Sequence, residues 1–333
     1  MDVLCIVGPT AVGKTKMSIE LAKQLNGEII SGDSMQIYRG MDIGTAKATM
    51  DERQGIPHHL IDEKNPDEPY SVAAFQQTVR AKMEEIKSRG KLPIIVGGTG
   101  LYIKSVLYDY EFAGESESKE IDEAKYGHLS NEELHAKLAA VDEAGAKDIH
   151  PNNRKRVIRA LEIYETSGVK KSEMIEKQEH KMIYDACLIG LTDDRNVLYD
   201  RINKRVDTMY ETGLVEEVKA LFDEGIPAES QSIRAIGYKE LYDYFKGLIS
   251  LEESKELIKR NSRRYAKRQY TWFNNQMDVT WFKVDVQHFD KTVKLAQTMS
   301  IITISHEETI HPEMAVDYVK EKIDAIEWTV TTF

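Results

Sequence analysis

Cysteine is scarce in this chain: Cys5 and Cys187 are the only two in 333 residues. Both lie in apolar, strand-like runs, so we interpret them as small core residues. Two isolated cysteines provide neither a zinc ligand set nor a disulfide framework. The chain also has no run of about 20 apolar residues, which excludes a membrane-spanning helix.

An excess of positive charge is absent as well. Lys and Arg number 45 against 56 Asp and Glu, which gives a net charge of −11. This balance excludes a nucleic-acid binder that relies on overall basicity, but it does not exclude local basic patches. The first residues include Asp2 and only a short apolar run, so we expect no secretory signal, no membrane association and a cytoplasmic protein.

The most informative segment is Gly8–Thr15, which follows an apolar run and precedes a helix-like run. Its pattern, Gly-x-x-x-x-Gly-Lys-Thr, is that of a phosphate-binding loop in the context the loop requires. The glycines let N–H groups turn toward phosphate oxygens, and Lys14 and the Thr15 hydroxyl reach a terminal phosphate and Mg²⁺. The alternative interpretation is a chance glycine turn. We expect a di- or triphosphate group to be bound by Gly8, Thr10, Ala11, Val12, Gly13, Lys14 and Thr15.

Two further candidates follow expected strands, where ligands bind in open α/β sheets. Asp33 follows the short strand 28–30, and it either caps a turn or serves as a metal–water ligand or general base. Thr99 lies in Gly97–Gly100, after the buried strand 93–96. This glycine cluster is either a tight turn into a helix or a place where backbone approaches a ligand, and we favour a ligand-facing Thr99.

Arg205 interrupts an otherwise apolar rhythm in the expected helix 194–210. An unpaired arginine that points inward is not tolerated, so it requires an anion such as a phosphate. The chain as a whole predicts an α/β fold: a P-loop NTPase-like core with a parallel sheet flanked by helices, plus an inserted helical domain. Ser71–Arg89 shows the spacing of an amphipathic helix, with Gly90 as its stop.

Two dense basic clusters occur in this acidic chain. Residues 154–159 form a basic face on the expected helix 151–166, and residues 259–268 alternate cations with aromatics on a long helix that continues to Phe273. Cations suit phosphate contacts, and aromatic or Arg faces suit stacking of unpaired bases. The alternative is a pair of solvated charged faces. Residues 111–125 are acidic and poor in apolar side chains, and we interpret them as a mobile linker.

Several motifs together are similar to those of the bacterial tRNA dimethylallyltransferase family, also called tRNA isopentenyltransferases. The resemblance extends from about residue 3 to residue 284, and it is carried by Gly8–Thr15, Asp33–Gln36, Gly40–Lys47, His58–Asp62, Gly97–Tyr102, Arg159–Glu162, Gly237–Glu240 and Tyr265–Trp272.

The resemblance implies transfer of a dimethylallyl group from dimethylallyl diphosphate to the exocyclic amine of the adenine 3′ of the anticodon, with Mg²⁺ as cofactor. It implies binding of the tRNA anticodon stem-loop, a flipped adenine that enters a channel, and a protein that we expect to be a monomer. The implied domains are a core of 1–111 and 182–284 with helical tRNA-binding elements, an inserted helical tRNA-binding domain of 112–181, and an acidic helical tail of 285–333.

The resemblance also implies residue roles. Asp33, Thr99 and Arg205 would be catalytic: Asp33 accepts a proton, Thr99 lines the channel or hydrogen-bonds the amine side of the base, and Arg205 neutralises the leaving diphosphate. Thr15 would bind the metal. The residues expected to contact tRNA are Asp33, Ser34, Met35, Gln36, Thr99, Lys155, Arg156, Arg159, Arg234, Gly237, Tyr238, Lys239, Arg263, Arg264 and Arg268.

The chain departs from the family pattern in a short, acidic segment 111–128, in Asn274 where an Arg is common, and in the tail beyond 284. Three rival functions share the phosphate loop. An isopentenyltransferase of free adenine nucleotides has no need of the basic clusters, a small-molecule P-loop kinase transfers a phosphoryl group from ATP, and a non-catalytic tRNA-binding protein has no need of Asp33, Thr99 and Arg205 at one site.

Overall fold

The computed structural model describes residues 1–110, 112, 123–177, 181–285 and 288–305. Contacts divide these residues into two compact units. One contains Met1–Pro69, Ala81–Ile103 and the described chain from Tyr184 onward, and the other contains Tyr70–Arg80 and Lys104–Ile183. The expected domain limits at 111–112 and 181–182 stay a prediction.

A six-stranded sheet forms the centre of the first unit, with the strand order β3-β2-β4-β1-β5-β6. Every neighbouring pair is parallel. Parallel sheets are covered on both faces, so their strands are continuous apolar runs, and each residue of β1 is buried. This confirms the predicted α/β P-loop fold. The strands are β1 (Val3–Val7), β2 (Gly27–Ser31), β3 (His58–His59), β4 (Leu92–Gly97), β5 (Ala186–Thr192) and β6 (Thr280–Lys283).

Both cysteines are buried thiols, as expected, and they lie on neighbouring strands of the sheet. Cys187 is paired in register with Leu4, and Cys5 with Leu188. Burial raises the pKa of the Cys5 thiol, so this side chain stays protonated and apolar in character. In the part of the chain that the structure describes, no helix is long and apolar enough to cross a membrane.

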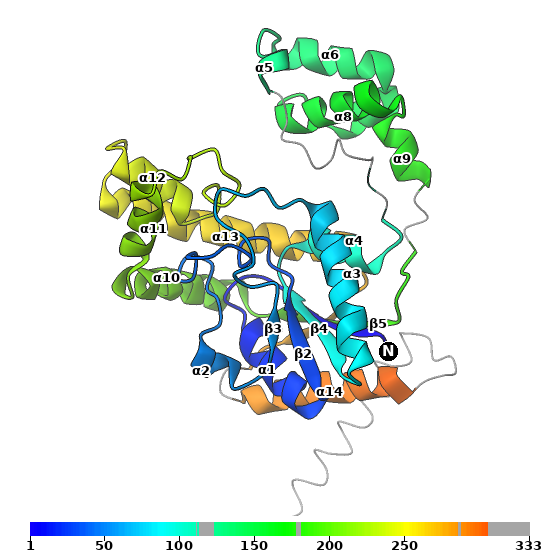
Figure 1. Ribbon diagram of the computed structural model, residues 1–333, viewed down its shortest axis with the longest axis vertical. Helices are drawn as coiled ribbons and strands as arrows, with labels where there is room; N and C mark the ends of the chain where they lie inside the picture. The colour runs from blue at the N-terminus through cyan, green and yellow to red at the C-terminus, as the bar shows by residue number, and fades with distance from the viewer. Residues whose placement is uncertain (111, 113–122, 178–180, 286–287, 306–333) are drawn as a thin grey trace, which may run out of the picture. The chain divides into compact units, whose positions relative to one another are not determined.

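One face of the sheet is covered by α1 (Lys14–Gln24) and α14 (Phe289–Ser305), which also contact each other. The blue α1 and the orange α14 lie side by side in Figure 1. Phe289, Val293 and Ala296 join the core cluster that contains the residues of β1 and α1. The first part of the expected tail is therefore a helix that belongs to the core, and residues 306–333 lie outside the described residues.

A group of helices follows β5 along the chain. The pairs α10–α13, α11–α12 and α12–α13 are in contact, and they form one lobe in Figure 1. The longest, α13, begins at a capping box in which Ser250 accepts the Glu253 N–H. Its 26 residues span about 39 Å at 1.5 Å per residue. The bounds are α10 (Arg195–Glu211), α11 (Leu214–Asp223), α12 (Tyr238–Phe245) and α13 (Leu251–Gln276).

The amphipathic pattern at 71–89 is confirmed as helix α3 (Val72–Ser88). Its predicted start is correct, because the Ser71 hydroxyl accepts the Ala74 N–H at 3.1 Å. Gly90 has φ +68°, a conformation that favours glycine and ends the helix. Two shorter helices complete this part of the chain, α2 (Met50–Arg53) and α4 (Gly100–Leu107).

The second unit has its own helical core. Its buried residues include Leu134, Leu138, Val157, Ile158 and Leu161. The helices are α5 (Glu123–Tyr126), α6 (Asn131–Val141), α7 (Glu143–Asp148), α8 (Arg154–Ser167) and α9 (Lys171–Lys177). The expected acidic linker at 111–125 lies mostly outside the described residues.

One buried carboxylate ties the amino ends of two strands to the end of α3. Glu28 on β2 is only 3% exposed, and its carboxylate lies 2.7 Å from His59, 2.7 Å from Arg89 and 3.0 Å from Lys91. Burial alone would raise the pKa of Glu28, but hydrogen bonds from His59, Lys91 and Arg89 lower it to about 2.

We therefore expect Glu28→Gln to lower the free energy of unfolding by about 2 kcal/mol at pH 7, because it removes the charge that three partners surround. Because the pKa of Glu28 is lowered, its carboxylate stabilises the fold fully above the pKa of the unfolded state, 4.5. This stabilisation is lost as the pH falls toward about 2. The difference in free energy of unfolding between wild type and variant, measured by urea titration, should thus become smaller from pH 5 to pH 3. Asp223→Asn, in the exposed pair with Lys219, should change stability by less than about 0.5 kcal/mol. An equal effect of both substitutions would contradict this role.

Candidate active site

The phosphate loop joins β1 to α1 in a conformation that its glycines allow. Gly8 has φ +140° and Gly13 has φ +107°. A Cβ on Gly8 would lie 2.5 Å from the Leu191 carbonyl oxygen, so the loop approaches β5 more closely than any side chain permits. Lys14 Nζ donates to the carbonyls of Gly8 and Pro9 at 3.0 and 2.7 Å. The ammonium group is therefore held against the loop itself.

The loop faces a cavity of about 1010 Å³ at the carboxyl ends of the strands. Segments far apart in the sequence contribute to its walls: the phosphate loop, the end of β2, residues 42–49, the end of β4, α10 and α13. Of the predicted site residues, the lining brings together Thr10, Ala11, Val12, Gly13, Lys14, Thr15, Asp33, Gln36 and Arg205. This is the convergence that the position of strand ends in a parallel sheet predicts.

The charged groups in this cavity are partly withdrawn from water, since Lys14, Asp33 and Arg205 are each half-buried. Burial, followed by repulsion from Arg205, lowers the pKa of Lys14 to about 7. Burial also lowers the pKa of Arg205, whose Nη1 donates to Thr10 Oγ1 at 3.5 Å. The pKa of Asp33 is raised by burial, although Lys14 and Arg205 oppose the shift. Two cations that repel each other at one cavity make it a site for an anion.

Asp33 forms the turn that the sequence offered as one alternative, and its role as a metal–water ligand or general base stays a prediction. Its Oδ1 accepts the Met35 N–H at 2.8 Å, which is the turn-forming role of an aspartate two residues upstream. The same side chain lines the cavity with Lys14 and Arg205. The turn therefore fixes the direction of the carboxylate, and the second oxygen can serve a ligand.

Thr99 lies beside this site, but it is not among the residues that line the cavity. Its hydroxyl accepts the Ser34 N–H at 3.3 Å and lies 3.5 Å from Ser34 Oγ. Tyr265 of α13 also hydrogen-bonds Thr99, and burial raises the pKa of this tyrosine to about 12. Thr99 thus connects the segment after Asp33 to α13.

The glycines of Gly97–Gly100 lie against other parts of the protein, and the expectation that the backbone here approaches a ligand stays a prediction. A Cβ on Gly97 would lie 2.3 Å from the Gly32 carbonyl oxygen, and one on Gly100 would lie 2.0 Å from the ring of Trp272. A Cβ on Gly98 would lie 2.0 Å from the Gln269 amide nitrogen. The glycines allow β4, the end of β2 and α13 to approach one another, and only Gly97 and Gly98 border the cavity.

Gln269 is a site residue that the sequence did not identify. Its side chain is 5% exposed, its Oε1 accepts the Thr10 N–H at 2.9 Å, and its Nε2 donates to the Gly98 carbonyl at 3.0 Å. One amide thus joins the phosphate loop to the glycine segment after β4. A single glutamine within a basic and aromatic helix gives no local signal of such a role, because its partners are distant in sequence.

The predicted tRNA contacts in the first unit differ in exposure. Arg234, Lys239, Arg264 and Arg268 are exposed, whereas Ser34, Met35 and Arg263 are half-buried. Arg263 donates to Asn203. Tyr238 is fully buried, with its hydroxyl 2.6 Å from Glu217 Oε1, and Gly237 is the buried residue before α12. The Tyr238 side chain is therefore an internal contact and has no surface to offer to tRNA.

The basic residues of α8 in the second unit also separate into two kinds. Lys155 and Arg156 are exposed, while Arg159 is half-buried and lies 3.2 Å from Glu162. Arg154, which the sequence places on the same basic face, instead donates to the carbonyls of Leu129 and Tyr126. Arg154 is thus an internal support of this unit.

A phosphate loop on a parallel sheet, with Lys14, Asp33 and Arg205 at one cavity, defines a P-loop protein built to hold a phosphorylated substrate. Comparison with known proteins gives the family. The model of the IPP transferase family matches residues 36–276, and this chain belongs to that family. The predicted resemblance is confirmed.

Relatives and solved structures agree with this assignment. The chain is 61% identical over 296 residues to a tRNA dimethylallyltransferase of Bacillus cytotoxicus, covering 88% of this chain and 93% of that protein. The full-length tRNA isopentenylpyrophosphate transferase of Bacillus halodurans is 50% identical with a TM-score of 0.67, over 90% of this chain and 96% of that chain. A eukaryotic dimethylallyltransferase that acts on tRNA is 30% identical with a TM-score of 0.81, over 95% of this chain and 83% of that chain.

The pKa of Lys14 makes anion binding dependent on pH. Below about 7 the ammonium is charged before the anion arrives, and above this value binding must take up a proton. We expect the affinity for inorganic diphosphate to fall by up to about tenfold per pH unit above pH 7 because of this group. Calorimetric titrations from pH 6 to pH 9 measure it.

Lys14→Arg is the matched comparison, since its guanidinium stays charged over this range. Titration of the diphosphate itself is common to both proteins, so the difference between their pH profiles isolates Lys14. Parallel profiles would refute the lowered pKa of Lys14.

Proposed function

We propose that this protein transfers a dimethylallyl group from dimethylallyl diphosphate to the exocyclic amine of the adenine 3′ of the anticodon in tRNA. The observation that supports the proposal is the meeting of Lys14, Arg205 and Asp33 at one cavity beside the phosphate loop. Cations there suit a diphosphate leaving group, and a carboxylate of raised pKa suits a proton acceptor.

In this reaction the bond between the allylic carbon and the diphosphate oxygen breaks, and the diphosphate leaves with the electron pair. The amine nitrogen forms the new bond to carbon. Lys14, Arg205 and the N–H groups of the phosphate loop stabilise the charge that develops on the leaving oxygen. A cavity partly withdrawn from water strengthens these interactions, because the effective dielectric constant is lower than in water.

The amine must lose a proton when the new bond forms, and Asp33 is the acceptor. An adenine amine is a weak nucleophile because its lone pair is delocalised into the ring, so orientation of the base carries much of the rate. The turn that fixes Asp33 through the Met35 N–H, and the hydrogen bond that the Ser34 N–H donates to the Thr99 hydroxyl, hold this segment in place. Thr99 then acts as a positioning residue beside the base.

Magnesium fits this site as a partner of the diphosphate. The Thr15 hydroxyl and the Asp33 carboxylate both border the cavity. Among the described residues no group of three or more His, Cys, Asp or Glu side chains could hold a metal ion alone. Mg²⁺ keeps several waters and binds through one or two protein oxygens plus substrate phosphates, so Thr15 directly and Asp33 through water would hold it. When bound, the ion neutralises phosphate charge.

Exposed cations on both units provide the tRNA contacts in this proposal: Lys155 and Arg156 on α8, Lys239 on α12 and Arg264 on α13. Residues 112–181 would be the inserted tRNA-binding domain. The target base lies in an unpaired loop, where extrusion costs least.

Asp33→Asn tests the reaction and the base together. The amide retains the shape of Asp33 and the bond from the Met35 N–H, but it cannot accept the proton. We expect single-turnover transfer of label from dimethylallyl diphosphate to unmodified tRNA, with Mg²⁺ present, to fall by roughly 10²–10⁴. Asp33→Ala should lose turnover and also the turn, with a lower melting temperature.

A near-wild-type rate in Asp33→Asn would remove Asp33 from the reaction and leave only its turn. Parallel incubations separate the rival functions. Label transfer to free adenine nucleotides but not to tRNA would favour the nucleotide prenyltransferase, and stoichiometric hydrolysis of ATP would favour the kinase.

Removal of exposed cations should weaken tRNA binding and flatten its dependence on salt. We expect the double variants Lys155→Ala with Arg156→Ala, and Lys239→Ala with Arg264→Ala, each to reduce the slope of log K against log salt by about 1–2. Fluorescence titrations of tRNA at 50–200 mM salt measure the slope, and diphosphate affinity should stay unchanged.

Two exposed lysines already paired within helices serve as controls: Lys147 with Glu143, and Lys219 with Asp223. Their substitution by alanine should leave the slope unchanged. If the basic double variants bind tRNA as the controls do, these faces are solvated surfaces.

A further inference from the structure

A single carboxylate on α11 holds the backbone of a loop that borders the cavity. Glu217 Oε2 accepts the N–H groups of Asp42 and Ile43 at 2.8 and 2.7 Å, and its Oε1 accepts the Gly44 N–H at 3.0 Å. Three consecutive N–H groups that converge on one anion form a backbone nest. Hydrogen bonds to an ionised acceptor are about twice as strong as neutral ones.

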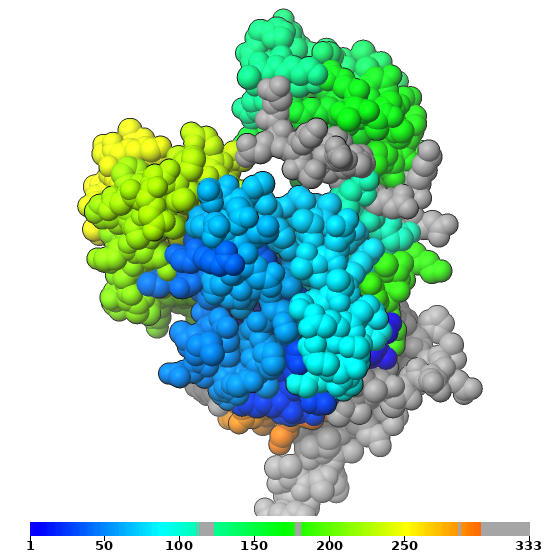
Figure 2. Space-filling view, viewed as in Figure 1, coloured from blue at the N-terminus to red at the C-terminus, as the bar shows by residue number. Residues whose placement is uncertain are grey.

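A second contact fixes the carboxylate itself. The hydroxyl of the buried Tyr238 donates to Glu217 Oε1 at 2.6 Å. The Tyr238 ring also packs on the loop, since a Cβ on Gly44 would lie 2.5 Å from the ring. Figure 2 shows the blue loop segment in contact with the yellow-green helical lobe. Glu217, Tyr238 and Gly44 thus form one contact between the loop and the helices.

The loop at residues 42–47 is part of the site wall. Asp42, Ile43, Thr45, Ala46 and Lys47 all line the cavity, as does Arg205 on α10, the helix that precedes α11. Glu217 therefore connects the wall that carries Arg205 to the loop. The phosphate loop makes no contact with Glu217 among the hydrogen bonds of the described residues.

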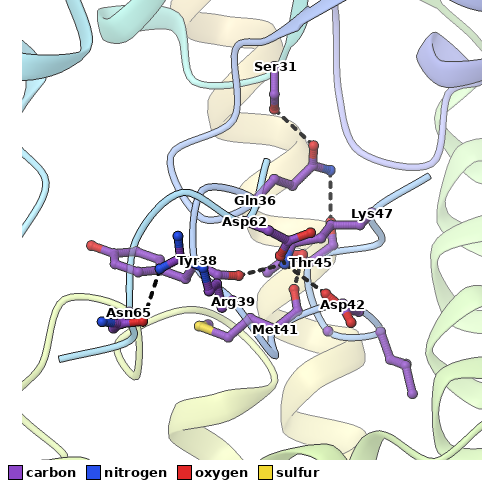
Figure 3. A network of polar contacts seen from close by, with 12 residues as sticks. Ser31, Gln36, Tyr38, Arg39, Met41, Asp42, Thr45, Lys47, Asp62 and Asn65 are labelled. Atoms are coloured by element: carbon purple, nitrogen blue, oxygen red, sulfur yellow. Dashed lines mark hydrogen bonds and ion pairs between the residues drawn. The ribbon is translucent and has the colours of Figure 1, made fainter. Parts of the chain in front are cut away.

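The loop is also joined to the segment that begins at Asp33 (Figure 3). Gln36 Nε2 donates to the Thr45 carbonyl at 3.2 Å and lies 3.4 Å from the Ala46 carbonyl, while its Oε1 accepts the Ser31 hydroxyl at 2.9 Å. Movement of the loop therefore acts directly on Gln36 and on the chain between Ser31 and Gln36.

A buried lysine tightens the other side of this network. Lys47 is 9% exposed, and its ammonium group contacts the Tyr38 carbonyl, Asp42 at 2.7 Å and Asp62. Lys47 binds the loop to Tyr38 and Asp62, whereas Glu217 and Tyr238 join the loop to the helical lobe.

We propose that Glu217 is a positioning residue for the transfer reaction: it sets the place of loop 42–47 and, through Gln36, of the Asp33 segment relative to the Arg205 wall. This inference rests on the proposed function for its kinetic part. Glu217 touches neither the phosphate loop nor Asp33, so its loss should disturb turnover more than the binding of diphosphate.

Glu217→Gln tests the proposal, with the adjacent and exposed Glu216→Gln as a matched control on the same helix. The amide offers one acceptor oxygen where the carboxylate offers two, so the three N–H groups lose part of their anchor. We expect kcat for transfer to fall by about tenfold to a hundredfold. The affinity for inorganic diphosphate should stay within about twofold of wild type, and hydrogen exchange at residues 42–44 should accelerate at least about tenfold. Glu216→Gln should match wild type in all three.

Gly44→Ala provides a second variant that leaves the charge in place. Its Cβ meets the Tyr238 ring, so it should separate loop and helices and reproduce the faster exchange and the lower kcat. Glu217→Asp, which keeps two acceptors on a shorter side chain, should recover part of the kcat that Glu217→Gln loses.

Wild-type exchange at 42–44 in Glu217→Gln would overturn the proposal. A loss of diphosphate binding together with kcat would also overturn it, because Glu217 would then support the fold as a whole. If wild-type protein transfers no dimethylallyl group, the proposed function fails, and the exchange comparison alone still decides whether Glu217 holds the loop.

Discussion

Partial removal of two cations from water is the constraint on which this site depends. Lys14 and Arg205 are far apart in the sequence, and the fold brings them to one cavity at the carboxyl edge of the parallel sheet. Each has a lowered pKa because burial penalises its charge. This arrangement favours an anion, and in the proposed reaction the same charges would act on the oxygen that leaves with the diphosphate. Under this proposal one arrangement of charges serves both binding and catalysis.

The surrounding structure keeps that arrangement fixed by contacts between backbone and side chain. Gln269 joins Thr10 of the phosphate loop to Gly98, and Thr99 joins the chain after Asp33 to Tyr265. Glu217 holds three N–H groups of the loop opposite. In each case backbone groups of a loop near the site are hydrogen-bonded by a side chain of the helical lobe, or by a residue that such a side chain contacts. Helix α13 holds the phosphate loop through Gln269 and is proposed to contact tRNA. One rigid helix would then fix the position of the tRNA relative to the diphosphate.

The sequence predicts the parts of this site that depend on local pattern. The phosphate loop follows from eight consecutive residues between a strand and a helix, and Asp33 follows from the rule that ligands bind at strand ends. Arg205 is predicted because it occupies a position in its helix where the spacing predicts an apolar, inward-facing residue, and an inward-facing arginine requires an anion. Gln269, Tyr265 and Glu217 are missed as site residues because their partners are far away in sequence. Even the Tyr265–Trp272 motif gives no sign that Gln269 bonds to Thr10 and Gly98. Gly98 and Gly100 show the opposite case. The sequence shows that these positions lack a side chain, but the residues that occupy the space, Gln269 and Trp272, are known only from the fold.

The strand order has a consequence for the growing chain. β1 lies between β4 and β5, and the residues between these two neighbours include 104–183 of the second unit. During synthesis one edge of β1 can pair as soon as Leu92–Gly97 has emerged, while the other must wait for Ala186–Thr192. At ~5–20 residues per second this wait is roughly 5–20 s, longer than helices such as α6 and α8 need to pack together. Until Ala186–Thr192 arrives, the backbone N–H and C=O groups along that edge of Val3–Val7 therefore have no strand to pair with.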